Sequence, residues 1–145
     1  MTGTKSIPEI QEEIVEEFEM LGEWPEKYEY LMNIGKHLPR LPEDAYNEAN
    51  KVRGCQSNVW MITKFEDGKI IFEGDSDALL VKGLVALLIR VFSNHSPDEI
   101  LASNLDFLER IGLQVHLSAT RGNGLLAMVK QIKFYALAYK AKMTA

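Results

Sequence analysis

The sequence predicts a single α+β domain in which one β-hairpin accompanies several amphipathic helices. The chain of 145 residues is long enough to bury a core without disulfide or metal support, and no repeat or Gly/Ser-rich linker divides it. Two segments rich in β-forming residues flank an Asp-Gly pair, and the segments on both sides show the apolar spacing of helices. We therefore expect residues 1–145 to form one domain.

The first part of the chain contains two expected helices. Apolar residues recur at helical spacing over residues 7–21, with glutamates on the other face, and Gly22 ends the pattern. A second, shorter helix is expected over residues 25–35. The stretch 37–50 contains two prolines, which interrupt helices, so we expect it to be irregular.

A β-hairpin is predicted next, with strands over residues 57–65 and 69–73. Both segments are rich in β-branched and aromatic residues. The pair Asp67-Gly68 between them is preferred in the type I′ turn that joins two antiparallel strands.

A central helix is predicted over residues 78–92, which are apolar nearly all round. The residues just before it, Asp75, Ser76 and Asp77, offer side-chain oxygens for an N-cap. The apolar segment has about 15 residues, whereas a membrane-spanning helix needs roughly 20. We therefore expect a buried helix and no membrane partner.

The last third of the chain predicts three more helices. Ser96, Pro97 and Glu99 form a capping box with proline at the first helical position. A short helix is expected over residues 107–111. A loop over residues 118–124 then leads into a final helix over residues 125–142.

Composition excludes several classes of function. The formal net charge is −5 and the pI is near 5.2, whereas nucleic-acid binders normally carry a concentrated basic surface. One cysteine excludes an internal disulfide framework and cysteine-rich zinc or iron–sulfur sites. The N-terminus has no apolar segment typical of a secretion signal, so we expect a cytoplasmic protein.

Charge is unevenly distributed along the chain. Residues 9–29 hold nine glutamates and one lysine, whereas residues 125–142 hold four lysines and no acid. Two interpretations remain open: two ordinary solvated helix faces, or a polarised surface that orients a partner by long-range electrostatics.

Cys55 is the main candidate for chemistry. It lies between a polar loop and the first expected strand, flanked by Gly54 and Gln56 rather than by the apolar residues that surround a structural cysteine. Arg53 is two residues away, and a nearby cation favours the reactive thiolate. The residues alone leave a reactive thiol and an inert loop cysteine equally open.

A single thiol supports two kinds of covalent chemistry. With His116 as its base, Cys55 is a candidate hydrolase nucleophile. Alternatively, it can carry a sulfur atom as a persulfide, and the absence of a second cysteine prevents discharge of that persulfide as a disulfide. Cysteine count therefore slightly favours sulfur carriage. A binding module with an incidental cysteine is the third interpretation.

The histidines and the aspartates near the hairpin have structural explanations that require no catalysis. His37, His95 and His116 are scattered without metal-binding spacing, so no metal is expected. Asp75 and Asp77 can be read as an acid–base pair, but helix capping is the favoured interpretation, with Asp77 the more exposed candidate for partner contact.

A long motif around the cysteine resembles the SufE family of sulfur-acceptor proteins, including its CsdE branch. The motif consists of Gly54-Cys55-Gln56-Ser57-Asn58-Val59-Trp60, then Glu73-Gly74-Asp75-Ser76-Asp77 and Val81-Lys82-Gly83-Leu84. The resemblance covers roughly residues 11–141. It implies an α+β fold similar to the IscU scaffold, in which an antiparallel sheet, the hairpin plus a third strand, packs on helices.

The resemblance also implies a function. Cys55 would take persulfide sulfur from a pyridoxal-phosphate-dependent cysteine desulfurase of the SufS or CsdA type, stimulate that enzyme, and pass the sulfur on to an iron–sulfur scaffold. Such a protein is an accessory sulfurtransferase rather than a free-standing enzyme, and it needs no cofactor of its own. Partner-binding or loop-shaping roles carry over by position to Arg53, Gly54, Gln56, Ser57, Asp75, Asp77 and Arg121.

Two departures from the family pattern affect the loops. Asn58 replaces a frequent glutamine, and residues 118–120 stand where a proline-containing loop is common. Arg121 therefore keeps three open roles: stabilising a thiolate, docking a partner or pairing with a helix carboxylate. We further expect loop 50–57 to hold Cys55 toward the apolar core in the free protein and to swing outward on docking.

Overall fold

The computed structural model describes residues 5–113, 117 and 119–144 of the chain. Its elements, in chain order, are α1 (Ile7–Met20), α2 (Trp24–Lys36), the 3₁₀ turns η1 (Glu43–Ala45) and η2 (Glu48–Asn50), β1 (Val59–Glu66), β2 (Lys69–Ser76), α3 (Leu79–Phe92), α4 (Pro97–Ala102), α5 (Asp106–Arg110) and α7 (Ala119–Thr144).

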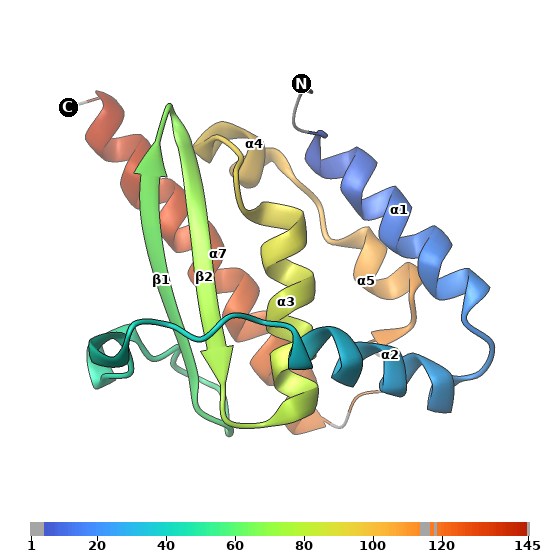
Figure 1. Ribbon diagram of the computed structural model, residues 1–145. Coiled ribbons are helices and arrows are strands. Elements are labelled where there is room, and N and C mark those ends of the chain that lie inside the picture. The colour runs from blue at the N-terminus through green and yellow to red at the C-terminus, as the bar shows by residue number, and fades with distance from the viewer. Residues whose placement is uncertain (1–4, 114–116, 118, 145) are drawn as a thin grey trace.

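Helix α3 lies at the centre of the arrangement (Figure 1). The hairpin β1–β2 and helix α7 lie on one side of it, α1 and α5 on the other, and α2 crosses its N-terminal end. These elements share one apolar core. The α+β class expected from the sequence is confirmed.

The core forms around α3 because this helix is apolar on nearly every face. Leu84, Val85 and Leu88 are fully buried, and each such side chain contributes roughly 1.5–3 kcal/mol on leaving water. Phe18 of α1 and Ile132 of α7 are buried in the same cluster. None of the described helices is long and apolar enough to cross a membrane.

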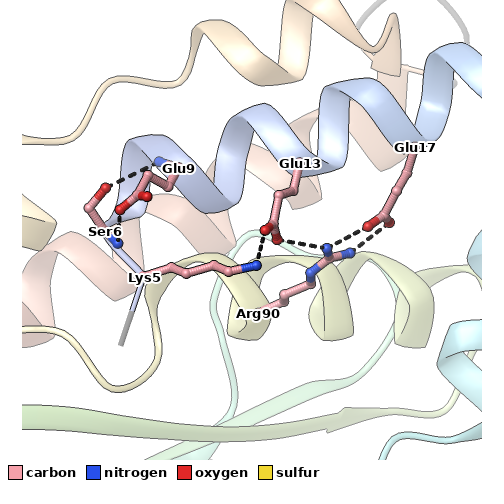
Figure 2. A network of polar contacts seen from close by, with 6 residues as sticks. All are labelled: Lys5, Ser6, Glu9, Glu13, Glu17 and Arg90. Atoms are coloured by element: carbon pink, nitrogen blue, oxygen red, sulfur yellow. Dashed lines mark hydrogen bonds and ion pairs between the residues drawn. The ribbon is translucent and has the colours of Figure 1, made fainter. Parts of the chain in front are cut away.

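Charged contacts attach α1 to the core helix (Figure 2). Ser6 and Glu9 form a capping box at the start of α1, which satisfies otherwise unpaired backbone N–H groups. Arg90 of α3 donates to both carboxylate oxygens of Glu17 at 2.8 and 2.6 Å. Glu13 lies beside this pair and also contacts Lys5.

The hairpin has the predicted turn. Asp67 and Gly68 have φ angles of 52° and 77°, the left-handed backbone that a type I′ turn requires at both positions. The register pairs Glu66 with Lys69 and continues to Val59 opposite Ser76.

Two boundaries and one helix cap differ most from expectation. Strand β2 extends to Ser76, three residues past its predicted end, and α3 starts with Ala78 as an N-cap that makes no side-chain cap bond. The prediction that Asp75 or Asp77 caps α3 is therefore wrong. Helix α7 begins at Ala119, so residues 119–124 are helical rather than loop.

The third strand is reduced to single bridges in the part of the chain that the structure describes. The sheet has two strands there, and isolated antiparallel bridges join Lys51 to Trp60 and Ile70 to His95. Each bridge lies beside one strand of the hairpin, where an additional strand would pair. The proline-containing stretch before Lys51 instead forms the two 3₁₀ turns.

Candidate functional site

Cys55 lies on a short connection, residues 53–57, which we call the thiol loop. The base of the loop is closed because the Val52 N–H donates to the Val59 carbonyl at 2.8 Å, next to the bridge between Lys51 and Trp60. Gly54 has a φ angle of +91°, a conformation that side-chain-bearing residues rarely adopt. The sequence therefore folds here into a tight turn that presents the next residue, Cys55.

The thiol loop rests on the first turns of α7. The Cys55 Sγ–H donates to the Gly124 carbonyl at 3.5 Å, and the side chain is half-buried against the core. A Cβ atom added at Gly124 would lie 3.6 Å from Sγ, and one added at Gly54 would lie 3.3 Å from the Ala127 Cβ. The small residues on both sides allow the loop and the helix to approach closely.

Burial raises the pKa of the Cys55 thiol above its ordinary value. Arg53 is exposed in the turn, and the expected lowering of the pKa by this cation is not found. At neutral pH the resting thiol is therefore mostly protonated. A reaction that needs the thiolate requires a change in its surroundings.

Asp75 lies buried in β2 rather than on a loop. Its Oδ2 accepts from the Tyr46 hydroxyl at 2.6 Å, its Oδ1 accepts from the Ser76 N–H at 2.8 Å, and Lys82 lies 3.5 Å from Oδ1. Burial, and then the bond to Asp75, raise the pKa of Tyr46, so its hydroxyl remains a donor. This carboxylate has a structural set of partners, and an open pocket of about 490 Å³ lies beside it.

Asp77 and Ser76 hold the exit of the thiol loop through Asn58. The backbone and side-chain N–H groups of Asn58 donate to the two Asp77 oxygens at 3.1 and 2.8 Å. The Ser76 hydroxyl donates to the Asn58 carbonyl at 2.8 Å. Asp77 is exposed, as expected, but its carboxylate fixes the position where β1 begins.

The remaining predicted residues fall into two groups. Arg53 and Gln56 are exposed and Ser57 is also at the surface of the loop, so all three border Cys55. Arg121 lies in the first turns of α7, but its side chain is outside the described part of the structure, as is the whole of His116. The three roles considered for Arg121 and the Cys55–His116 pairing are therefore untested.

No three His, Cys, Asp or Glu side chains lie together in a metal-binding arrangement within residues 5–113, 117 and 119–144. His37 contacts the Asn33 carbonyl through Nδ1 at 2.9 Å. His95 is buried, with Nε2 at 2.7 Å from the Lys5 carbonyl. Both described histidines thus have structural contacts: His37 makes an exposed hydrogen bond within α2 and its C-cap, and His95 is part of the buried interior.

Four contributors to the site were not recognised from the sequence. Gly124 and Ala127 form the surface under the thiol loop, Tyr46 holds Asp75, and Asn58 ties the loop exit to Asp77. If α7 is known to begin before Gly124, the three-residue spacing places Gly124 and Ala127 on the same face of the helix. Nothing in the sequence near Tyr46 indicates its contact with a residue 29 positions away.

Comparison with known proteins gives consistent matches along the chain. Residues 12–136 match the family described as "SufE: Fe-S metabolism associated domain". The chain is 42% identical over 127 residues to an uncharacterized SufE-like protein of Rhizobium meliloti, covering 84% of this chain and 91% of that protein. It is 42% identical over 135 residues to an uncharacterized SufE-like protein of Synechocystis, covering 93% and 85%.

Two further similarities come from a plant and from a solved structure. SufE-like protein 1, chloroplastic/mitochondrial, of Arabidopsis thaliana is 41% identical over 139 residues, which are 95% of this chain and 38% of that protein. The solution structure of a hypothetical protein from Thermus thermophilus has a TM-score of 0.74 at 21% identity, covering 94% of this chain and 97% of that one. The latter similarity concerns the fold alone.

Proposed function

The chain belongs to the SufE family, and from this premise we propose that it accepts persulfide sulfur from a cysteine desulfurase on Cys55. The family is associated with iron–sulfur metabolism, which gives the sulfur a destination in cluster assembly. The observation that carries the proposal is the placement of the only cysteine on a short, glycine-containing loop at the edge of the core.

The transfer is a thiol–persulfide exchange. The Cys55 thiolate attacks the outer sulfur of the donor's persulfide, so a bond forms between Sγ and that sulfur. The sulfur–sulfur bond of the donor breaks, and its electron pair leaves with the donor's cysteine as a thiolate. No net oxidant or reductant is consumed, because one persulfide is exchanged for another.

The resting geometry protects the thiol and allows it to move. Cys55 is held by burial and by one long S–H···O contact to Gly124, and sulfur is a weak hydrogen-bond donor. The base of the loop is held more firmly at Val59 and Asp77. In our proposal residues 53–57 swing outward as a unit when the donor docks, which returns the thiol to water and lowers its pKa.

The partners in our proposal are those that membership of the SufE family implies. The donor is a pyridoxal-phosphate-dependent desulfurase of the SufS or CsdA type, whose turnover the chain stimulates by removing its persulfide. The acceptor is an iron–sulfur scaffold. We place the reaction in the cytoplasm, where thiols are kept reduced.

Intact mass spectrometry tests the proposal. The chain is incubated with desulfurase, pyridoxal phosphate and cysteine, and its mass is measured before and after reduction. We expect an added mass of about 32 Da, that of one sulfur atom, which reduction removes and which Cys55→Ser never acquires.

Other outcomes identify other functions. An acyl adduct from an ester substrate would indicate the hydrolase interpretation with Cys55 and His116. Stable binding of the desulfurase without any added mass would indicate a binding module. Either result in place of the sulfur adduct would reject sulfur carriage.

A further inference from the structure

We propose that one exposed face of α7, Leu126, Lys130, Phe134 and Leu137, is the surface on which the sulfur donor docks. We call these four residues the α7 stripe. The inference rests on the proposed function and adds where on this chain the donor binds. The inference is supported by the exposure of these side chains, by their position relative to Cys55 and by the charge of α7.

The α7 stripe exposes apolar side chains that a helix normally buries. Leu126, Phe134 and Leu137 are 51%, 60% and 57% exposed. Their spacing, with Lys130 between them, places all four residues on the same face of the helix. Contiguous exposed apolar side chains bordered by polar residues mark interaction sites, whereas single ones do not.

The α7 stripe is continuous with the surface that carries the thiol loop. The loop contacts α7 at Gly124 and Ala127, within the same turn as Leu126. With a rise of about 1.5 Å per residue, Leu126 lies roughly 3 Å, Lys130 about 9 Å and Phe134 about 15 Å beyond Gly124 along the helix axis. At about 100° per residue, the centre of the stripe is turned roughly a quarter of the way round the helix from the face of Gly124 and Ala127. The stripe therefore starts level with the thiol loop and runs away from it along α7.

A donor that reaches Cys55 must cover much of this face. A typical stable interface buries about 800 Å² on each partner, which corresponds to a disc of roughly 16 Å radius. Leu137 lies about 20 Å beyond Gly124 along the helix axis. Because such a disc is roughly 32 Å across, one with Cys55 near one edge and Leu137 near the other covers the whole stripe. The donor and the α7 stripe would then meet in the same encounter that transfers the sulfur.

The charge of α7 indicates what the donor presents. Lys133 is engaged by α4 carbonyls, Lys140 by Asp98 at 2.8 Å, and Lys142 lies over the Tyr139 ring. Within the described residues Lys130 pairs with no carboxylate, and it lies in the middle of the stripe. A partner surface complementary to the α7 stripe is apolar and carries a carboxylate opposite Lys130.

A second copy of the chain is the alternative occupant of this surface. Its acidic helix α1 would be the complementary element, but Glu13 and Glu17 already contact Lys5 and Arg90 (Figure 2). Glu12 is likewise held by Arg110 at 2.7 Å. Glu16 and Glu19 of α1 are exposed, so the sedimentation measurement below separates a second copy from the donor.

The test compares stripe variants with a matched control. The variants are Phe134→Ser/Leu137→Ser and Lys130→Glu, and the control is Met20→Ser, which alters an apolar side chain 85% exposed on α1. Two quantities are measured for each: the concentration that half-maximally stimulates the desulfurase, and the rate at which a low-molecular-weight persulfide loads Cys55. Circular dichroism verifies that every variant is folded.

The expected result separates docking from chemistry. Loss of central apolar contacts in Phe134→Ser/Leu137→Ser raises the half-maximal concentration about tenfold or more. Lys130→Glu raises it similarly because it places a carboxylate opposite the carboxylate of the donor, and Met20→Ser leaves it unchanged. Loading by the small persulfide stays at the wild-type rate in all of them, because the thiol itself is untouched.

Two outcomes would overturn the docking inference while leaving the proposed function intact. One is an unchanged half-maximal concentration in both stripe variants. The other is a wild-type dimer in sedimentation analysis that Phe134→Ser/Leu137→Ser dissociates, since the stripe would then be a contact between copies. Failure of the wild-type chain to take up any sulfur would instead reject the proposed function.

Discussion

At the scale of single residues, the Cys55 thiol combines reactive chemistry with a resting environment that suppresses it. Burial against α7 raises its pKa, so the folded state favours the neutral thiol. Alkylation by iodoacetamide requires the thiolate. We therefore expect the alkylation rate of the free protein to rise with pH around a midpoint higher than that of the same chain unfolded in denaturant.

Gly124 provides a variant that changes this environment selectively. An added Cβ at Gly124 lies in ordinary contact with Sγ, so Gly124→Ala should keep the raised midpoint. The larger side chain of Gly124→Leu occupies the space of the thiol and should shift the midpoint down toward the unfolded value. A midpoint in the wild-type protein at or below that of the unfolded chain would contradict the buried resting state.

The site could be predicted from sequence only where its signal is local. The motif around Cys55 consists of neighbouring residues and is visible in the sequence, and it includes Gly54, which the structure shows with a positive φ. The raised pKa was missed because Arg53 is near in sequence, whereas the desolvating surface of α7 comes from a residue 69 positions away. Desolvation of the thiol by this distant segment therefore determines the direction of its pKa shift, and the neighbouring charge of Arg53 does not.

At the scale of elements, the crossing of α2 and α3 depends on the absence of a side chain at Gly83. A Cβ atom there would overlap the Leu31 carbonyl oxygen, so the two backbones would have to separate. We expect Gly83→Ala to lower the free energy of unfolding by about 3 kcal/mol, the upper end of typical overpacking costs. Thermal unfolding followed by circular dichroism measures the change.

The control for this prediction is Gly22→Ala. Gly22 lies at the surface, and its added Cβ would meet only the carboxylate end of Glu26, which can move. Its stability should stay within about 0.5 kcal/mol of wild type, as for most surface substitutions. Equal unfolding temperatures for Gly83→Ala and the wild-type protein would show that the helices do not cross as described.

Elements with self-contained signals were predicted correctly, and elements defined by distant partners were not. The capping box of Ser96 and Glu99 and the turn at Gly68 are complete within a few residues. The end of β2 at Ser76 depends on pairing with Val59, and the start of α7 depends on packing under the thiol loop. Because glycine disfavours helix formation, Gly122 and Gly124 led to the prediction of a loop where α7 begins.

At the scale of the whole molecule, internal ion pairs explain part of the uneven charge. Glu12, Glu13 and Glu17 of α1 are paired with basic side chains from outside that helix. Hydrogen bonding to Arg90 lowers the pKa of Glu17, and the pair keeps its charge near neutral pH. Glu16 and Glu19 of the same helix are exposed, so the three ion pairs account for only part of the acidic face of α1.

The proposed function depends on Cys55 receiving the sulfur and thereby relieving the donor. The most direct measurement is desulfurase turnover on cysteine in the presence of equal concentrations of the wild-type chain or Cys55→Ser, both verified as folded. We predict that the wild-type chain accelerates turnover and that Cys55→Ser binds the enzyme without accelerating it. Equal acceleration by the two proteins would contradict sulfur transfer through Cys55.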